Sequence, residues 1–96
     1  MIKIEFEEDG TKGKFVIYEN DLYAGEMTFS WAGTEKFIVD HTGVDSIHSG
    51  KGFGRKLFFK VVEYAREKGV KVLPLCPFVK AEFDKNPDAA DVLHSI

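Results

Sequence analysis

The stretch Ser49-Gly50-Lys51-Gly52-Phe53-Gly54-Arg55-Lys56-Leu57 decides the organisation of the chain, because it joins a glycine-rich, basic turn to the start of an amphipathic helix. Glycine lets backbone N–H groups approach a ligand closely, and the unpaired N–H groups at a helix start carry partial positive charge. The stretch therefore predicts a cradle for an anion such as a phosphate group.

The helix that leaves this turn is predicted over residues 52–68, where apolar residues recur at intervals of about three or four positions. That spacing gives one apolar stripe to lay on a sheet, and Gly69 suits the helix end. A second, short helix is predicted over residues 78–85, because Pro77 favours a first helical turn and Asn86-Pro87 ends it.

Alternating apolar and polar residues predict strands before and after the main helix. Four strands come before it and one follows it, over residues 2–7, 15–18, 22–31, 35–44 and 70–75. Short turns with glycine, asparagine or aspartate connect the first four, which predicts an antiparallel meander. Gly25 indicates a bulge in the third strand, and Pro74 indicates an edge, a bulge or a splayed end in the fifth.

Two details of packing follow from the same patterns. In the fourth strand, strict alternation places Phe37, Val39 and His41 on one face. In the tail, Val92, Leu93 and Ile96 are apolar and available to pack onto the rest of the chain.

The chain has the size and composition of one small globular domain spanning residues 1–96, and its nine phenylalanines predict a core built largely from Phe. A net charge of -3 argues against nucleic acid or a membrane surface as a partner, since both select a basic excess. The single cysteine excludes an internal disulfide, and the first residues do not form a signal sequence. A soluble, cytoplasmic protein is therefore expected.

Two familiar phosphate-binding motifs do not fit the glycine-rich turn. A dinucleotide fingerprint needs glycine where Arg55 stands, and a Walker A loop needs glycine at Asp45 and Ser or Thr at Gly52. What remains is a strand, a Gly-x-Gly-x-Gly turn with two cations, and a helix that starts within the turn. A purely structural glycine turn is the alternative interpretation of this pattern taken alone.

The stretch Ser49-Gly50-Lys51-Gly52-Phe53-Gly54 resembles the coenzyme A pyrophosphate loop of the GCN5-related N-acetyltransferases, whose pattern is Arg or Gln, two residues, Gly, one residue, then Gly or Ala. Ser49 departs from it, because the family prefers Arg or Gln there. Residues 38–44 and 72–79 on either side are similar to a small subgroup with a minimal domain. The resemblance covers nearly the whole chain.

The resemblance implies an α/β (α+β) fold with a mixed, mostly antiparallel five-stranded sheet, in which the fourth and fifth strands run parallel and then splay. Acetyl-CoA would lie in the slot between them. The coenzyme-binding residues implied are Thr42, Gly43, Val44, Ser49, Gly50, Lys51, Gly52, Phe53, Gly54 and Arg55. Lys85 could reach a coenzyme phosphate. Larger members carry two helices that shape the acceptor site, and this chain has no room for them.

Cys76 and His41 are the candidate catalytic residues, and the minimal subgroup carries both in the same motifs. A helix start favours the thiolate form of Cys76, and His41 on a neighbouring strand would strengthen that effect. The thiol could accept the acyl group covalently, protonate the departing coenzyme, or line the pocket inertly. As a base for the amine, His41 is favoured over Asp40 and Glu26 because imidazole exchanges its proton near neutral pH.

The predicted function is transfer of acetyl from acetyl-CoA to the amine of a small molecule or peptide, by a monomer or weak dimer. The alternatives are a coenzyme A binding or sensing module without turnover, and an interaction domain that has lost the ligand. The histidines and the cysteine are too scattered along the chain to predict a metal site.

Overall fold

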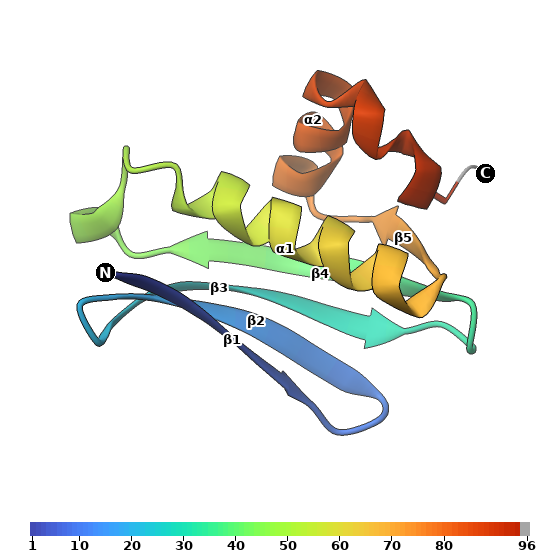
Figure 1. Cartoon of the computed structure of the whole chain (residues 1–96), viewed down its shortest axis with the longest axis horizontal. Coiled ribbons are helices and arrows are strands. Elements are labelled where there is room, and N and C mark those ends of the chain that lie inside the picture. The colour runs from blue at the N-terminus through green and yellow to red at the C-terminus, as the bar shows by residue number, and fades with distance from the viewer. Residues whose placement is uncertain (95–96) are drawn as a thin grey trace.

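The computed structural model describes residues 1–94 as two layers, a five-stranded sheet and a set of helices that cover one of its faces (Figure 1). The strands are β1 (Ile2–Glu8), β2 (Lys12–Glu19), β3 (Leu22–Trp31), β4 (Lys36–Val44) and β5 (Lys71–Pro74). The helices are η1 (Ser46–His48), α1 (Phe53–Lys68), α2 (Pro77–Lys85) and η2 (Pro87–Val92). No helix in this described range is long and apolar enough to cross a membrane.

The strands lie in sequence order, with β1 to β4 antiparallel and β5 parallel to β4. Short turns allow the antiparallel pairs, whereas α1 supplies the long crossover that a parallel pair needs. The mixed sheet, the main helix after the fourth strand and the short helix after the fifth are confirmed. β5 is also an edge strand, which explains how it tolerates Pro74.

The core lies between the sheet and α1, and phenylalanine dominates it as predicted. Phe15, Phe29 and Phe37 project from three strands and are almost completely buried. The apolar stripe of α1 covers them, with Leu57 and Phe58 fully buried. Each such side chain contributes roughly 1.5–3 kcal/mol by leaving water, so this layer supplies much of the driving force for folding.

A bulge in β4 overturns the predicted strict alternation. Phe29 of β3 pairs with Val39 while Thr28 pairs with His41, so Asp40 is an extra residue in β4. Residues opposite each other in a sheet share a face, and Thr28 lies on the face away from α1 because its neighbours Met27 and Phe29 are in the core. His41 therefore faces away from the helices, and the prediction that it shares a face with Val39 is wrong.

A second irregularity confirms the bulge predicted near Gly25. Ile17 pairs with Gly25 but Tyr18 pairs with Tyr23, which leaves Ala24 as the extra residue. Gly25 itself accommodates a close approach, since a Cβ there would lie 2.6 Å from the carbonyl oxygen of Gly43.

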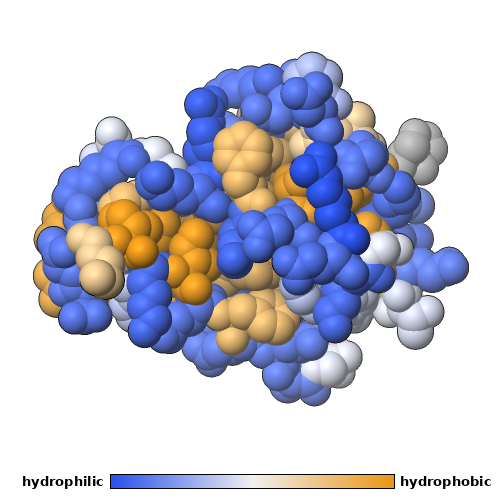
Figure 2. All heavy atoms as spheres, viewed as in Figure 1, coloured by the Kyte–Doolittle hydropathy of each residue, from blue (hydrophilic) through white to orange (hydrophobic). Residues whose placement is uncertain are grey.

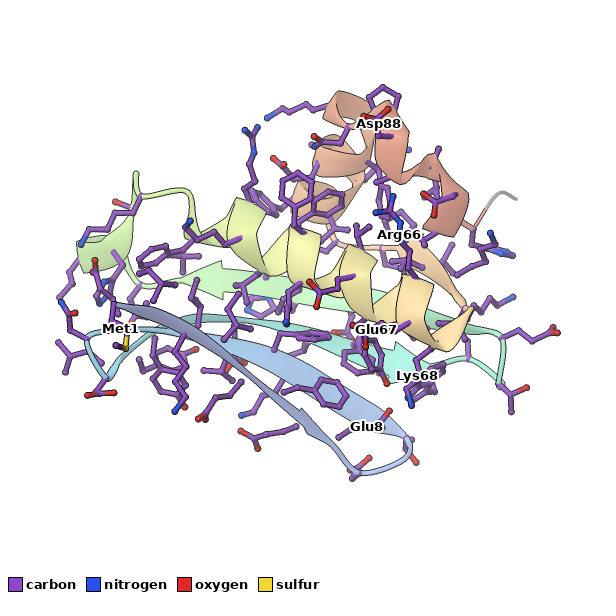
Figure 3. The ribbon with its side chains drawn as sticks, in the orientation of Figure 1. Met1, Glu8, Arg66, Glu67, Lys68 and Asp88 are labelled. Carbon is purple, nitrogen blue, oxygen red and sulfur yellow. The ribbon has the colours of Figure 1, made fainter. Side chains whose placement is uncertain are left out.

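The tail packs against the far end of α1. Arg66 donates from Nε and Nη2 to the Asp91 carboxylate, both at 2.9 Å, and from Nη2 to the Asp88 carbonyl oxygen. Figure 3 labels Arg66 on α1 and Asp88 on η2. Arg66 therefore ties the end of α1 to η2. Val92 is buried and Leu93 bridges to Val72, whereas Ile96 lies outside the described residues.

Candidate functional site

The site begins where β4 and β5 part. Their last pair is Val39 with Pro74, and the N–H groups of Leu75 and Cys76 both donate to the Val39 carbonyl, at 3.2 and 3.0 Å. Beyond this point the chain leaves the sheet to form α2, while β4 continues to Val44 with β3 as its neighbour. The second half of β4 consequently presents an edge that faces the start of α2 instead of another strand.

Backbone groups on this edge are available to a ligand. The Asp45 N–H donates to the Ala24 carbonyl on the β3 side at 2.8 Å. Because backbone groups alternate in direction along a strand, those of Gly43 also face β3, and those of Thr42 and Val44 face the open edge. Of the three strand residues predicted to bind the coenzyme through their backbone, two are oriented for it.

A groove of about 490 Å³ continues from this edge to the glycine-rich turn. Its lining residues are Thr42, Val44, His48, Ser49, Gly50, Gly52, Phe53, Gly54, Arg55, Phe78 and Glu82. Figure 2 shows hydrophobic side chains at the surface on the side of the molecule that carries η1 and the start of α1. The structure thus gathers eight of the predicted binding residues around one groove and leaves Gly43, Lys51 and Lys85 outside its lining.

The start of α1 is arranged to receive an anion. Gly52 is the N-cap residue, no side chain caps the helix, and its first turn contains no acidic residue. The first N–H groups of α1 therefore point toward the groove without a capping oxygen, and the helix dipole adds positive potential. Gly50 and Gly52 hold φ values of 78° and 75°, a left-handed conformation that favours glycine.

Gly54 has a different role from the two glycines before it. A Cβ at this position would lie 2.6 Å from Cζ of Phe78, so α1 and α2 approach closely at this residue. Gly54 therefore permits the packing of Phe78 over the start of α1, at the mouth of the groove.

Lys51 is held by a carboxylate beside the groove. Its Nζ donates to Oε1 of Glu19 at 2.6 Å, and Nδ1 of the buried His48 lies 3.0 Å from the same oxygen. The hydrogen bond from Lys51 is the main cause that holds the pKa of the Glu19 carboxyl below its ordinary value, and His48 adds to it. No local sequence pattern gives His48 a partner, because Glu19 lies on β2, far away along the chain.

Arg55 and Lys85 converge on Glu82, a carboxylate that is only 3% exposed. Nε of Arg55 donates to Oε1 of Glu82 at 3.2 Å, and Nζ of Lys85 lies 3.7 Å from Oε2. A buried carboxylate needs such partners. Since Glu82 takes only the Nε hydrogen, the terminal Nη groups of Arg55 can serve an anion in the groove.

Cys76 is the N-cap residue of α2, as predicted, and it is buried on the helix side of the sheet. Its Sγ donates to the Thr42 hydroxyl at 3.3 Å. His41 lies on the opposite face, where its imidazole covers Gly43, since a Cβ on that glycine would lie 3.0 Å from His41 Nε2. The structure does not bring His41 to Cys76, and the prediction that His41 acts on the thiol is wrong.

Four residues of the site were missed by sequence reasoning, and His48, which lines the groove, is one of them. Glu19, Glu82 and Phe78 take part only through contacts with distant segments, and no local spacing marks them. Among residues 1–94, no group of three or more His, Cys, Asp and Glu side chains gathers as a metal site would require.

Comparison with known proteins places this geometry in a family. Residues 14–92 match the family model described as GCN5-related N-acetyl-transferase. The chain is 31% identical to a GCN5-like protein from Staphylococcus aureus solved by NMR, over 96% of this chain and 89% of that one, with a TM-score of 0.72. No curated protein sequence matches.

Two further solved structures resemble the chain. A nourseothricin acetyltransferase is 32% identical over 68% of this chain and 40% of its own, with a TM-score of 0.57. A GNAT family acetyltransferase from Elizabethkingia anophelis with acetyl-CoA bound shares the fold at 12% identity, covering 90% of this chain and 74% of that one, with a TM-score of 0.71.

Proposed function

The chain belongs to the GCN5-related N-acetyltransferase family, and we propose on that premise that it transfers acetyl from acetyl-CoA to an amine. The observation that carries the proposal is the continuity of the open β4 edge with the groove at the start of α1. Coenzyme A carries its pantetheine amides and its pyrophosphate one after the other along its length. The protein offers backbone groups for the amides at the β4 edge and an uncapped helix start for the phosphates at the other end of the groove, in the same order.

The binding roles follow from the groups on either side of the groove. The N–H groups at the start of α1 and the Nη groups of Arg55 would hold the pyrophosphate. The backbone of Thr42 and Val44 would pair with the pantetheine amides, as an added strand does at a sheet edge. Lys51 would reach a phosphate by exchanging its contact with Glu19 for one with the ligand.

Acetyl-CoA supplies an acyl group activated as a thioester. In the transfer, the amine nitrogen bonds to the carbonyl carbon as the carbon–sulfur bond breaks, while the amine loses a proton and the coenzyme sulfur gains one. An N–H on the β4 edge would polarise the carbonyl. Cys76 lies on the helix side beside Thr42, and in this proposal its thiol gives the coenzyme sulfur its proton.

Two measurements test the function. Isothermal titration calorimetry with acetyl-CoA is expected to show one binding site, and loss of thioester absorbance with a panel of polyamines, amino acids and basic peptides is expected to show turnover. Binding without turnover on any amine would favour a coenzyme sensor. Absence of binding would reject both coenzyme functions.

The role of Cys76 is tested separately by mass spectrometry after incubation with acetyl-CoA. A proton donor forms no adduct, and Cys76→Ala is expected to slow turnover while coenzyme affinity stays unchanged. An acetyl adduct on Cys76 would establish the covalent route instead. Unchanged turnover in Cys76→Ala, with no adduct on the wild type, would leave the thiol as pocket lining.

A further inference from the structure

A second groove lies on the face of the sheet that the helices leave uncovered. Its volume is about 470 Å³, and it is lined by Glu7, Glu8, Asp9, Lys12, Gly13, Lys14, Thr28, Phe29, Ser30 and Asp40. We call it the open-face groove. The helix layer of Figure 1 covers the other face, so the open-face groove and the coenzyme groove lie on opposite sides of the sheet.

Asp40 is held in this groove by two hydroxyl groups. Thr28 Oγ1 donates to Oδ1 at 2.5 Å and Ser30 Oγ donates to Oδ2 at 3.1 Å. Both donors project from β3, so the carboxylate lies over the sheet instead of moving freely in solvent. No ion pair neutralises Asp40 among residues 1–94, and this leaves a fixed negative charge in the open-face groove.

The groove also carries three other carboxylates and two lysines. The Asp9 carboxylate accepts from the N–H groups of Thr11 and Lys12, at 2.9 and 2.8 Å, and Glu8 accepts from the Trp31 indole. Lys14 is opposite Glu7 on β1, where opposite charges attract across the strands. Four carboxylates against two lysines leave the groove with a net negative charge, and Asp40 is the carboxylate that hydroxyl groups hold over the sheet.

Asp40 also occupies the point where β4 and β5 part, directly after Val39. The bulge turns both Asp40 and His41 to the open face, while Thr42 and Cys76 remain on the helix side. A thioester held between the parted strands would have Cys76 on one side and Asp40 with His41 on the other. The two grooves thus meet across one segment of β4.

We propose that the open-face groove binds the acceptor as a primary alkylammonium ion, with Asp40 as its counterion and His41 as the acceptor of its proton. This inference rests on the proposed acetyl transfer. His41 takes one proton from the ammonium nitrogen, and the resulting amine forms its bond to the thioester carbon as the bond from carbon to sulfur breaks. The nitrogen then loses a second proton to solvent. The coenzyme sulfur receives a proton from Cys76 on the opposite side of the sheet, and the Cys76 thiolate regains one from solvent.

NMR titration of the whole chain, labelled with nitrogen-15, tests the groove directly. Spermidine and a lysine-containing peptide are the two ammonium probes, and aniline is the uncharged control. Both ammonium probes are expected to shift the amide signals of Thr28, Ser30 and Asp40, with the larger effect identifying the preferred source. No shifts, shifts elsewhere, or equal shifts with aniline would overturn the proposal.

Variants make the test specific. Asp40→Asn keeps one oxygen acceptor, and its NH2 group can donate to the other hydroxyl, so the contacts with β3 are retained without the charge. It is expected to weaken ammonium binding by about fivefold, whereas Glu5→Gln, a change at an exposed carboxylate on β1, is expected to leave it unchanged. Thr28→Val removes one of the two hydroxyl groups that hold Asp40 but keeps its charge. It is expected to weaken ammonium binding less than Asp40→Asn does. Equal affinity in Asp40→Asn and the wild type would overturn the role of Asp40.

A parallel titration with coenzyme A separates this proposal from the proposed function. Coenzyme A is expected to shift the amide signals from Gly50 to Gly54 in the wild type and in Asp40→Asn alike. If coenzyme A shifts none of these signals, the coenzyme function is rejected. The ammonium titration decides separately whether the open-face groove binds an ammonium ion. In turnover assays, Asp40→Asn is expected to raise KM for the amine about fivefold with KM for acetyl-CoA unchanged.

Discussion

The two halves of β4 differ although they belong to one strand. Residues 36–39 lie between β3 and β5, and Phe37 and Val39 are completely buried. Residues 40–44 pair only with β3, contain the bulge and remain partly or fully exposed. The first half of β4 therefore supports the fold, and the second half presents backbone groups to ligands.

The change between the halves occurs at Val39 for two reasons. On the β5 side, one carbonyl accepts two successive N–H groups, so the neighbouring chain turns away into α2. On the β3 side, the extra residue Asp40 reverses which side chains face the helices. The bulge therefore puts His41 on the open face and Thr42 on the helix side, at the point where β5 has left the sheet.

The largest expected effect is on stability in the paired half. Phe37→Ala removes a fully buried ring and is expected to lower the free energy of unfolding by about 3–5 kcal/mol. Thr42→Ala, in the open half, is expected to cost less than about 1 kcal/mol. Urea denaturation measures both, and equal losses would contradict the division of β4.

Two glycines with the same backbone conformation separate the effect of backbone strain on stability from an effect on coenzyme binding. Gly33 and Gly52 hold φ values of 81° and 75°, and nothing lies within 4 Å of a Cβ at either position. Alanine at either residue is expected to cost about 1–2 kcal/mol of stability, because each adopts a left-handed conformation. Only Gly52→Ala is expected to weaken coenzyme A binding in calorimetry, since Gly33 lies in the turn before β4.

A matched pair of arginines on α1 tests the anion site. Arg55→Ala is expected to weaken coenzyme A binding by about tenfold, because a charge-assisted hydrogen bond is worth roughly 1.5–3 kcal/mol. Arg66→Ala breaks the contacts with Asp91 at the other end of the helix. If Arg66→Ala weakens coenzyme binding as much as Arg55→Ala, the phosphates do not lie at the start of α1.

The smallest effect concerns pH. The pKa of Glu19 is lowered mainly by Lys51, so this interaction stabilises the fold above the ordinary carboxyl pKa of 4.5 and is lost as pH falls through the lower folded value. Glu19→Gln is expected to flatten the acid limb of the stability profile slightly. Thermal denaturation between pH 5 and 2, with the wild type alongside, measures this; an identical acid limb would contradict it.

Much of the fold could be predicted from periodicity and glycine placement. The stripe on α1, the presence of five strands and the turn before α1 each follow from local sequence patterns, and the structure confirms them. The bulge at Asp40 has no such signal, because three apolar residues, 37–39, are followed by three polar ones, 40–42, and such runs do not mark the two faces of a strand. One extra residue therefore reversed the predicted face of His41.

The electrostatics of the site lay beyond local reasoning for a related reason. Glu19 meets His48 and Lys51 across 29 and 32 residues of chain, and Arg55 meets Glu82 across 27. Such contacts depend on how the folded sheet and helices bring distant segments of the chain side by side. The two cations of the glycine-rich turn, Lys51 and Arg55, could be predicted from the sequence, whereas the carboxylates that hold them, Glu19 and Glu82, could not.

Amide hydrogen exchange along β4, with and without coenzyme A, tests the central claim most directly. The N–H groups of Thr42 and Val44 are expected to exchange fast in the unliganded chain and to become protected when coenzyme A binds, while Phe37 and Val39 stay protected throughout. Unchanged exchange at Thr42 and Val44 in the presence of bound coenzyme would contradict the assignment of the open half of β4 as the coenzyme edge.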